Sequence, residues 1–129
     1  MNLLLDTHTF LWAIDSPELL PERIEQLLSN NTSIWFLSLT SVWEIQIKSE
    51  LGKLRLSLPL SELIETQQQT NDLRLLPVEL SHIYALSGLP HHHRDPFDRL
   101  LITQARVERL PLLSRDSIFD AYDLERIWI

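Results

Sequence analysis

Cysteine is absent from this chain of 129 residues, and glycine occurs only twice. Without cysteine the protein forms no disulfide, no zinc–thiolate site and no thiol nucleophile. With so little glycine it lacks the glycine-rich loop that cradles phosphate in many nucleotide-binding proteins. No apolar run is long enough to span a membrane, and the first residues do not have the pattern of a secretory signal. We therefore expect a cytoplasmic protein that does not enter the membrane.

Basic residues are also few: the chain has 11 lysines and arginines and 18 aspartates and glutamates, which gives a formal net charge of -7. This balance argues against a protein that binds nucleic acid through positive charge alone. It does not exclude an enzyme that acts on nucleic acid, because divalent cations held by carboxylates reverse the local charge. The remaining composition, 44% hydrophobic and 22% charged, is that of a globular protein, and the length predicts a single domain over residues 1–129.

Short apolar runs alternate with amphipathic segments along the chain. The run Leu3-Leu4-Leu5 is wholly apolar, which suits a strand buried on both faces of a parallel sheet. We expect strands at 3–5, 33–38, 73–77, 110–113 and 126–129, and helices at 7–14, from Pro17 or Pro21 to 28, and at 40–51, 60–70, 79–87, 96–108 and near Asp116. This alternation predicts an α/β fold with helices on both faces of a mostly parallel sheet.

Four acids stand out by their positions: Asp6, Glu44, Asp98 and Asp116. Asp6 and Asp116 each follow an expected strand, Glu44 lies in the helix after the second strand, and Asp98 lies near the start of the helix at 96–108. Because the carboxyl ends of parallel strands share one edge of a sheet, these four side chains can converge there.

Each of these acids also has an ordinary structural interpretation. Asp6 and Asp116 can cap the helices that follow them. Glu44 can form a helix-surface pair with Lys48, worth about 0.3 kcal/mol. Asp98 can be favoured by the dipole of the helix whose first turn it occupies. Together these interpretations explain why acids occur at these positions, but not why four of them fall on the same expected edge.

Several carboxylates in one place repel one another unless a cation is present. Hard divalent ions such as Mg²⁺ prefer oxygen ligands, and the absence of histidine or cysteine from this set favours phosphoryl chemistry over zinc chemistry. The three consecutive histidines at 91–93 point in different directions, so we expect them to form a solvated loop near the acidic edge rather than a metal site.

The stretches that carry these acids resemble PIN-domain proteins. They are LLDTHTFLW at 4–12, SVWEIQIK at 41–48, LGKL at 51–54, HHRDPFDRLLITQA at 92–105 and LLSRDSIF at 112–119. The sequence is most similar to the VapC-like branch, the ribonuclease toxins of bacterial type II toxin–antitoxin pairs. The resemblance covers nearly the whole chain, and its motifs follow the order of the family.

The resemblance implies an α/β/α sandwich and an endoribonuclease that uses Mg²⁺ or Mn²⁺ to hydrolyse RNA phosphodiester bonds. By the same comparison, Asp6, Glu44, Asp98 and Asp116 would be both the catalytic residues and the metal ligands. Glu44 would hold the ion directly or through water, or help to activate the attacking water. The family also implies a homodimer and a cognate antitoxin protein that covers the early helices and approaches the acidic pocket.

Other residues receive supporting roles from the same resemblance. Asp95 precedes a proline and is expected to cap, whereas Asp120 is a possible peripheral member of the pocket. Thr7 and Ser114 could orient carboxylates or waters. Four basic side chains are candidates for phosphate contacts: Lys48, Arg94, Arg99 and Arg115.

Two other enzyme or signalling classes are disfavoured by missing residues. A haloacid-dehalogenase-like phosphatase would need a second aspartate at the position of His8. A receiver domain would need paired acids after the first strand and a lysine after a late strand. The remaining alternative is a PIN-like protein-interaction module without nuclease activity, and the intact set of acids weighs against it.

Overall fold

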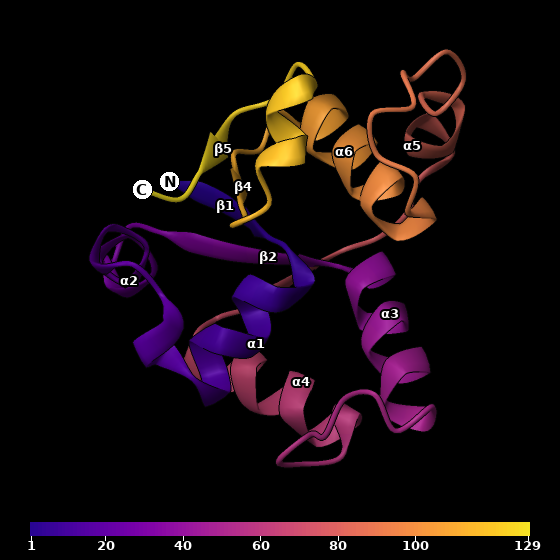
Figure 1. Ribbon diagram of the computed structural model, residues 1–129. Helices are drawn as coiled ribbons and strands as arrows, with labels where there is room; N and C mark the ends of the chain where they lie inside the picture. The colour runs from indigo at the N-terminus through magenta and orange to yellow at the C-terminus, as the bar shows by residue number, and fades with distance from the viewer.

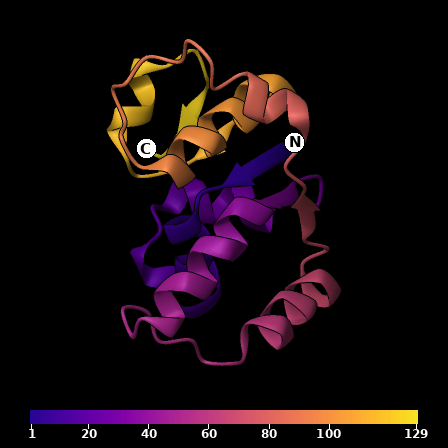
Figure 2. The same cartoon turned by 90° about the vertical axis from the view of Figure 1, so that its right-hand side faces the viewer.

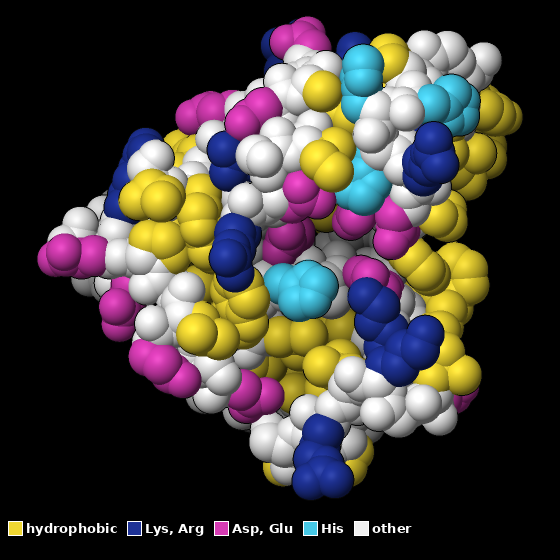
Figure 3. Space-filling view, in the orientation of Figure 1, with side chains coloured by type: hydrophobic (Ala, Val, Ile, Leu, Met, Phe, Trp, Pro, Cys, Tyr) yellow, Lys and Arg dark blue, Asp and Glu magenta, His cyan; other side chains and the backbone are white.

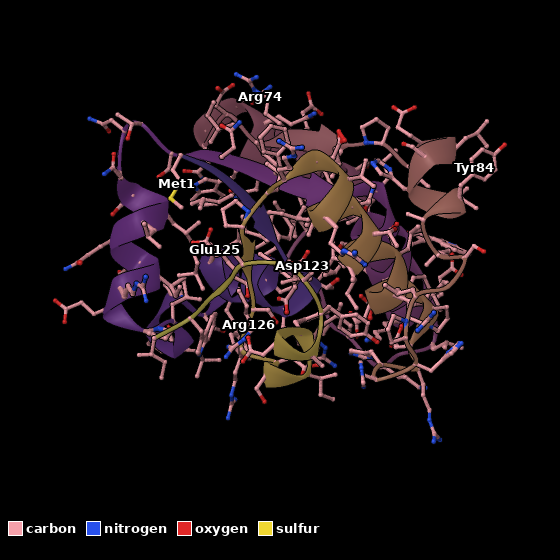
Figure 4. All side chains as sticks on the ribbon, turned by 90° about the horizontal axis from the view of Figure 1, so that it is seen from above. Met1, Arg74, Tyr84, Asp123, Glu125 and Arg126 are labelled. Atoms are coloured by element: carbon pink, nitrogen blue, oxygen red, sulfur yellow. The ribbon has the colours of Figure 1, made fainter.

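The computed structural model describes residues 1–129 and contains one five-stranded sheet in which every neighbouring pair of strands is parallel. The order of strands is β3-β2-β1-β4-β5, so the first strand lies in the centre. The strands are β1 (Asn2–Leu5), β2 (Ile34–Ser38), β3 (Arg74–Leu76), β4 (Leu112–Leu113) and β5 (Arg126–Ile127). Figure 4 shows Arg74 of β3 and Arg126 of β5 at opposite edges of this sheet.

Helices cover both faces of the sheet, as the rotated view in Figure 2 makes clear. They are α1 (Thr7–Asp15), α2 (Glu22–Ser29), α3 (Leu39–Glu50), α4 (Leu60–Thr70), α5 (Leu80–Tyr84) and α6 (Pro96–Glu108), with 3-10 turns η1 (Pro17–Leu19) and η2 (Ser117–Ala121). In Figure 1, α1, α2 and α4 lie below the sheet, whereas α5, α6 and η2 lie above it. The predicted α/β/α fold is therefore confirmed.

The central strand β1 supplies side chains to both cores. Leu3 and Leu5 pack in the cluster that includes Phe10 of α1 and Ile24 of α2, while Leu4 packs in the opposite cluster, on the α6 side. All three leucines are fully buried. Because side chains alternate along a strand, an apolar run without alternation fits only a strand that is covered on both faces.

Proline and left-handed residues set several helix boundaries. The expected second helix divides into η1 and α2, and Pro21 is the residue immediately before α2. Gly52 has a φ of +74° just after α3, which suits its role as the end signal predicted from the sequence. The fifth helix is shorter than the predicted segment 79–87 and covers only Leu80–Tyr84. No helix is long and apolar enough to cross a membrane.

Candidate active site

In Figure 1, β1 and β2 run from left to right, and beyond their carboxyl ends the start of α3 faces the start of α6. The ring of Trp43 on α3 meets the ring of Phe97 on α6 edge to face, with 5.2 Å between centroids. The backbone N–H of Asp6 donates to the carbonyl of Leu113 over 3.1 Å, which ties the end of β1 to the end of β4. These contacts bring four separate parts of the chain to one edge.

Asp6 is buried at this edge and has two structural partners. Its Oδ1 accepts a 2.8 Å hydrogen bond from the backbone N–H of Thr9, which caps α1. Its Oδ2 accepts a hydrogen bond from the hydroxyl of Ser114, which follows β4. Burial raises the pKa of Asp6, although these hydrogen bonds oppose that rise. Asp6 is thus both a helix cap and a buried acid of the edge.

Glu44 is also buried, with 5% of its surface exposed, so its interpretation as a surface residue is wrong. Its Oε1 accepts a 2.6 Å hydrogen bond from the hydroxyl of Thr7, and its Oε2 lies 2.7 Å from the Nζ of Lys48. The hydrogen bond to Glu44 raises the pKa of Lys48. The predicted pairing with Lys48 does exist, but it occurs at the rim of the acidic cluster.

Asp98 is shifted both by burial and by neighbouring acids. Burial, followed by the negative charges of Asp95, Glu44, Asp6 and Asp116, raises the pKa of Asp98 to about 7. Burial is the largest cause, and the four charges add to it because they lie nearby and are poorly screened by water. The structure therefore brings the four acids singled out from the sequence into one electrostatically coupled cluster.

Asp116 connects β4 to η2 and takes part in both capping and the cluster. Its Oδ1 accepts a 3.0 Å hydrogen bond from the backbone N–H of Ile118, which caps η2. Its backbone N–H donates to the hydroxyl of Ser114 over 3.0 Å. Since the same hydroxyl donates to Asp6, Ser114 links two acids of the cluster. Thr7 and Ser114 thus contact the carboxylates that they were expected to orient.

The histidine loop lies near the acidic edge, as predicted, but His93 is not solvated and lies among these acids. Its Nε2 is 2.9 Å from the Oδ2 of Asp98 and 3.3 Å from the Oδ2 of Asp116. Potential ligand atoms of these three residues all lie within 4.8 Å of one another. His91 and His92 are exposed, as expected. Sequence reasoning missed His93 because it treated the three histidines as one unit.

The remaining acids and one of the basic candidates have structural partners. Asp95 caps α6 by accepting hydrogen bonds from the backbone N–H groups of Phe97 and Asp98, as predicted. Asp120 is exposed, outside the cluster, and forms two hydrogen bonds with Arg126, which lower the pKa of Asp120. Arg99, a candidate for phosphate contact, instead donates to three carbonyl groups of the loop before α6: those of Leu89, Pro90 and His93.

An open pocket of about 430 Å³ adjoins the acids and has both charged and aromatic walls. Its lining consists of Asp6, His8, Trp12, Arg115, Asp116 and Ser117. In Figure 3, acidic side chains surround a hollow near the centre of the face, and basic side chains flank it. Of the phosphate-contact candidates, Arg115 is therefore the one that borders the pocket, while Lys48 is paired with Glu44 and Arg94 is exposed.

The sequence pattern of the PIN domain matches residues 3–125, so the chain belongs to the PIN domain family. Among solved structures, VapBC2 from Rickettsia felis, bound to a DNA fragment from its promoter, is 16% identical over 98% of each chain, with a TM-score of 0.72.

Two further solved structures share the fold over nearly their full length. A DNA-bound VapBC from Salmonella typhimurium is 18% identical over 98% of this chain and 97% of that chain, with a TM-score of 0.67. A toxin–antitoxin complex from Klebsiella pneumoniae is 13% identical over 97% of this chain and 95% of that chain, with a TM-score of 0.64. No curated protein matches the sequence. At these identities the similarity demonstrates a common fold.

Proposed function

We propose that this protein is a divalent-metal-dependent endoribonuclease that hydrolyses RNA phosphodiester bonds as the toxin of a toxin–antitoxin pair. The observation that carries the proposal is the convergence of four acids at one edge of the sheet. Ser114 bonds the carboxylate of Asp6 and the backbone of Asp116. The carboxylates of Asp98 and Asp116 both lie within 3.3 Å of the Nε2 of His93. Glu44 accepts a hydrogen bond from Thr7, the residue next to Asp6. Membership of the PIN domain family supports nuclease activity. A cation at this position would offset the repulsion that the four acids cause.

The donor set fits Mg²⁺ or Mn²⁺, which prefer oxygen ligands and use few carboxylates together with water and substrate phosphate. Asp6, Asp98 and Asp116 would hold the ion, with Glu44 as a further ligand, either directly or through water. When bound, such an ion lowers the pKa of a coordinated water and stabilises charge that develops on a phosphodiester.

Hydroxyl groups and a lysine keep the carboxylates in place for this role. Ser114 donates to Asp6, while Thr7 and Lys48 hold the two oxygens of Glu44. These bonds prevent the acids from turning away from one another, which is the movement that like charges favour. The chain thereby keeps a pre-organised set of oxygens at the edge of the sheet.

Arg115 is the best candidate for a contact with the RNA backbone. Arg115 lines the same pocket as Asp6 and Asp116, so its guanidinium would lie near an RNA phosphate bound at the proposed ion. Arginine suits this role because its planar guanidinium matches the oxygens of phosphate. In a chain with a net charge of -7, local positive charge must come from such side chains and from the ion.

The toxin role further implies an antitoxin protein as a partner. The Klebsiella pneumoniae relative is a toxin–antitoxin complex, and we extend that partnership to this chain as part of the proposal. Trp12 and His8 of α1 lie in the pocket beside Asp6, so a partner segment on α1 could reach the acids.

A homodimer is the assembly that the exposed apolar side chains favour. Five large apolar residues on α3 and α5 are exposed: Leu39, Trp43, Leu80, Ile83 and Tyr84. Figure 4 shows Tyr84 at the periphery of the molecule, and the right side of Figure 3 is rich in hydrophobic atoms. Exposed apolar side chains on neighbouring helices favour a protein interface, and in a homodimer the same surface serves both copies.

The test is induced expression of the wild-type protein or Asp98→Asn in a bacterium, followed by sequencing of RNA 5′ ends. We expect the wild type to stop growth and to create new ends in a small set of RNAs, whereas Asp98→Asn should do neither at equal protein levels. Asp123→Asn, at an exposed acid outside the site, should behave as the wild type. Identical RNA ends with wild type and Asp98→Asn would contradict the proposal and favour a PIN-like interaction module without nuclease activity.

A further inference from the structure

His93 is fixed in the loop before α6 by contacts from three directions. Its backbone N–H donates to the hydroxyl of Tyr122 over 2.7 Å, and its carbonyl accepts from Arg99 over 3.2 Å. Its ring packs against the ring of Phe119, with 5.5 Å between centroids. The side chain is 11% exposed. A histidine held in this way has little freedom to swing out of the acidic cluster.

The hydrogen bonds of the ring determine which nitrogen carries the proton. The backbone N–H of Asp95 donates to the Nδ1 of His93 over 3.3 Å, so Nδ1 acts as the acceptor. In a neutral imidazole the other nitrogen, Nε2, then bears the hydrogen. Nε2 is also the atom that faces the Oδ2 atoms of Asp98 and Asp116. His93 therefore presents an N–H group to two carboxylates.

This arrangement differs from that of a histidine that binds metal. A ligating histidine coordinates through a deprotonated nitrogen and donates its other N–H to a carbonyl or a carboxylate. In His93, the nitrogen that faces the acids carries the proton, and the opposite nitrogen faces a donor. His93 is therefore placed to hold the carboxylates of Asp98 and Asp116 in position, and not to coordinate the metal ion itself.

The spacing of the carboxylate oxygens around Nε2 is relevant to metal binding. Two oxygens at right angles around an ion, each about 2.1 Å away, lie about 3.0 Å apart. Asp98 and Asp116 approach Nε2 to 2.9 and 3.3 Å, and the potential ligand atoms of the group stay within 4.8 Å of one another. Without the N–H between them, these like-charged groups would move apart.

We propose that His93 is a positioning residue whose Nε2–H holds Asp98 and Asp116 together, so that both carboxylates can bind one divalent cation, without itself binding the ion. This inference rests on the proposed function, because it concerns the same metal site. The new element is His93, which is not one of the four acids proposed as metal ligands. Partners that orient metal ligands contribute about 10- to 100-fold to metal affinity, and we expect an effect of this size here.

The test compares Mn²⁺ dissociation constants, measured by electron paramagnetic resonance, for the wild type, His93→Gln and His93→Leu. The amide nitrogen of glutamine can occupy the position of Nε2 and donate, whereas leucine cannot. We expect His93→Leu to bind Mn²⁺ about 10- to 100-fold more weakly and His93→Gln to stay within a few-fold of the wild type. His91→Leu, at an exposed neighbouring histidine, serves as the control and should be unchanged. Circular dichroism checks that all variants are folded.

The outcomes separate this inference from the proposed function. Pulsed resonance spectra of wild-type protein with Mn²⁺ should show no coupling to a directly bound imidazole nitrogen. Such a coupling, with equal losses in the glutamine and leucine variants, would overturn the positioning role in favour of a ligand. Unchanged affinity in His93→Leu would overturn the inference while leaving the metal site intact. Failure of the wild type to bind Mn²⁺ would overturn the proposed function and this inference together.

Discussion

Individual acids at the sheet edge combine structural and electrostatic roles. Asp6 caps α1 and Asp116 caps η2, yet both charges also act on Asp98. A cap uses one carboxylate oxygen as acceptor, which leaves further lone pairs on the same group. For these two residues, capping and membership of the acidic cluster are therefore compatible.

At the scale of the residue, the raised pKa of Asp98 predicts a pH-dependent stability in chelator. The carboxyl has a pKa of about 7 in the folded protein and about 3.9 when unfolded, so the folded state binds the proton more tightly. The free energy of unfolding should then fall as pH rises from about 4 to about 7. Asp98→Asn removes this contribution.

Urea denaturation at pH 4.5 and 7.5 measures the effect. From pH 4.5 to 7.5, the free energy of unfolding of Asp98→Asn should rise by about 2 kcal/mol relative to that of the wild type. This is roughly half of what the whole change in pKa would give, because the side chain is 27% exposed and water screens its charge. Asp123→Asn, outside the cluster, is the matched control. A stability difference between wild type and Asp98→Asn that does not change with pH would contradict the coupling of these acids.

At the scale of elements, sequence patterns predicted most helices and strands because their signals are local. Three such signals are the apolar run of β1, the Asp95-Pro96 start of α6 and Gly52 after α3. Each involves only a few consecutive residues. The prediction failed where the chain contacts distant residues. His93 is held by Tyr122, 29 residues away. For Glu44, only the alternative of a surface pair was wrong, because the side chain is buried against Thr7, 37 residues away.

The exposed surface of α3 and α5 carries a prediction at the same scale. If this surface forms a homodimer, Tyr84→Arg should weaken dimerisation about 10-fold or more, because the change places a charge in an apolar interface. Sedimentation of the isolated protein across a range of concentrations measures the effect. Leu19→Arg, at an exposed apolar residue on η1, is the matched control. A wild type that stays monomeric, or equal dimerisation in both variants, would rule out this interface.

At the scale of the whole molecule, the fold gathers distant acids that the sequence keeps apart. The parallel sheet aligns the ends of β1, β2 and β4, and α6 brings Asp98 to the same edge. The convergence was predictable because parallel strands share one carboxyl edge. The identity of the supporting donors was not, since Ser114 reaches Asp6 across 108 positions of sequence.

Cleavage of end-labelled bacterial RNA by purified protein in Mn²⁺, in Mg²⁺ and in chelator tests the proposed nuclease activity without other cell components. We expect cutting with either metal, none in chelator, and a loss of about 100-fold or more in Asp98→Asn. Purifying the variant in parallel controls for contaminating ribonuclease. Cutting that persists in chelator, or that Asp98→Asn retains at the wild-type rate, would contradict a metal-dependent nuclease built on these four acids.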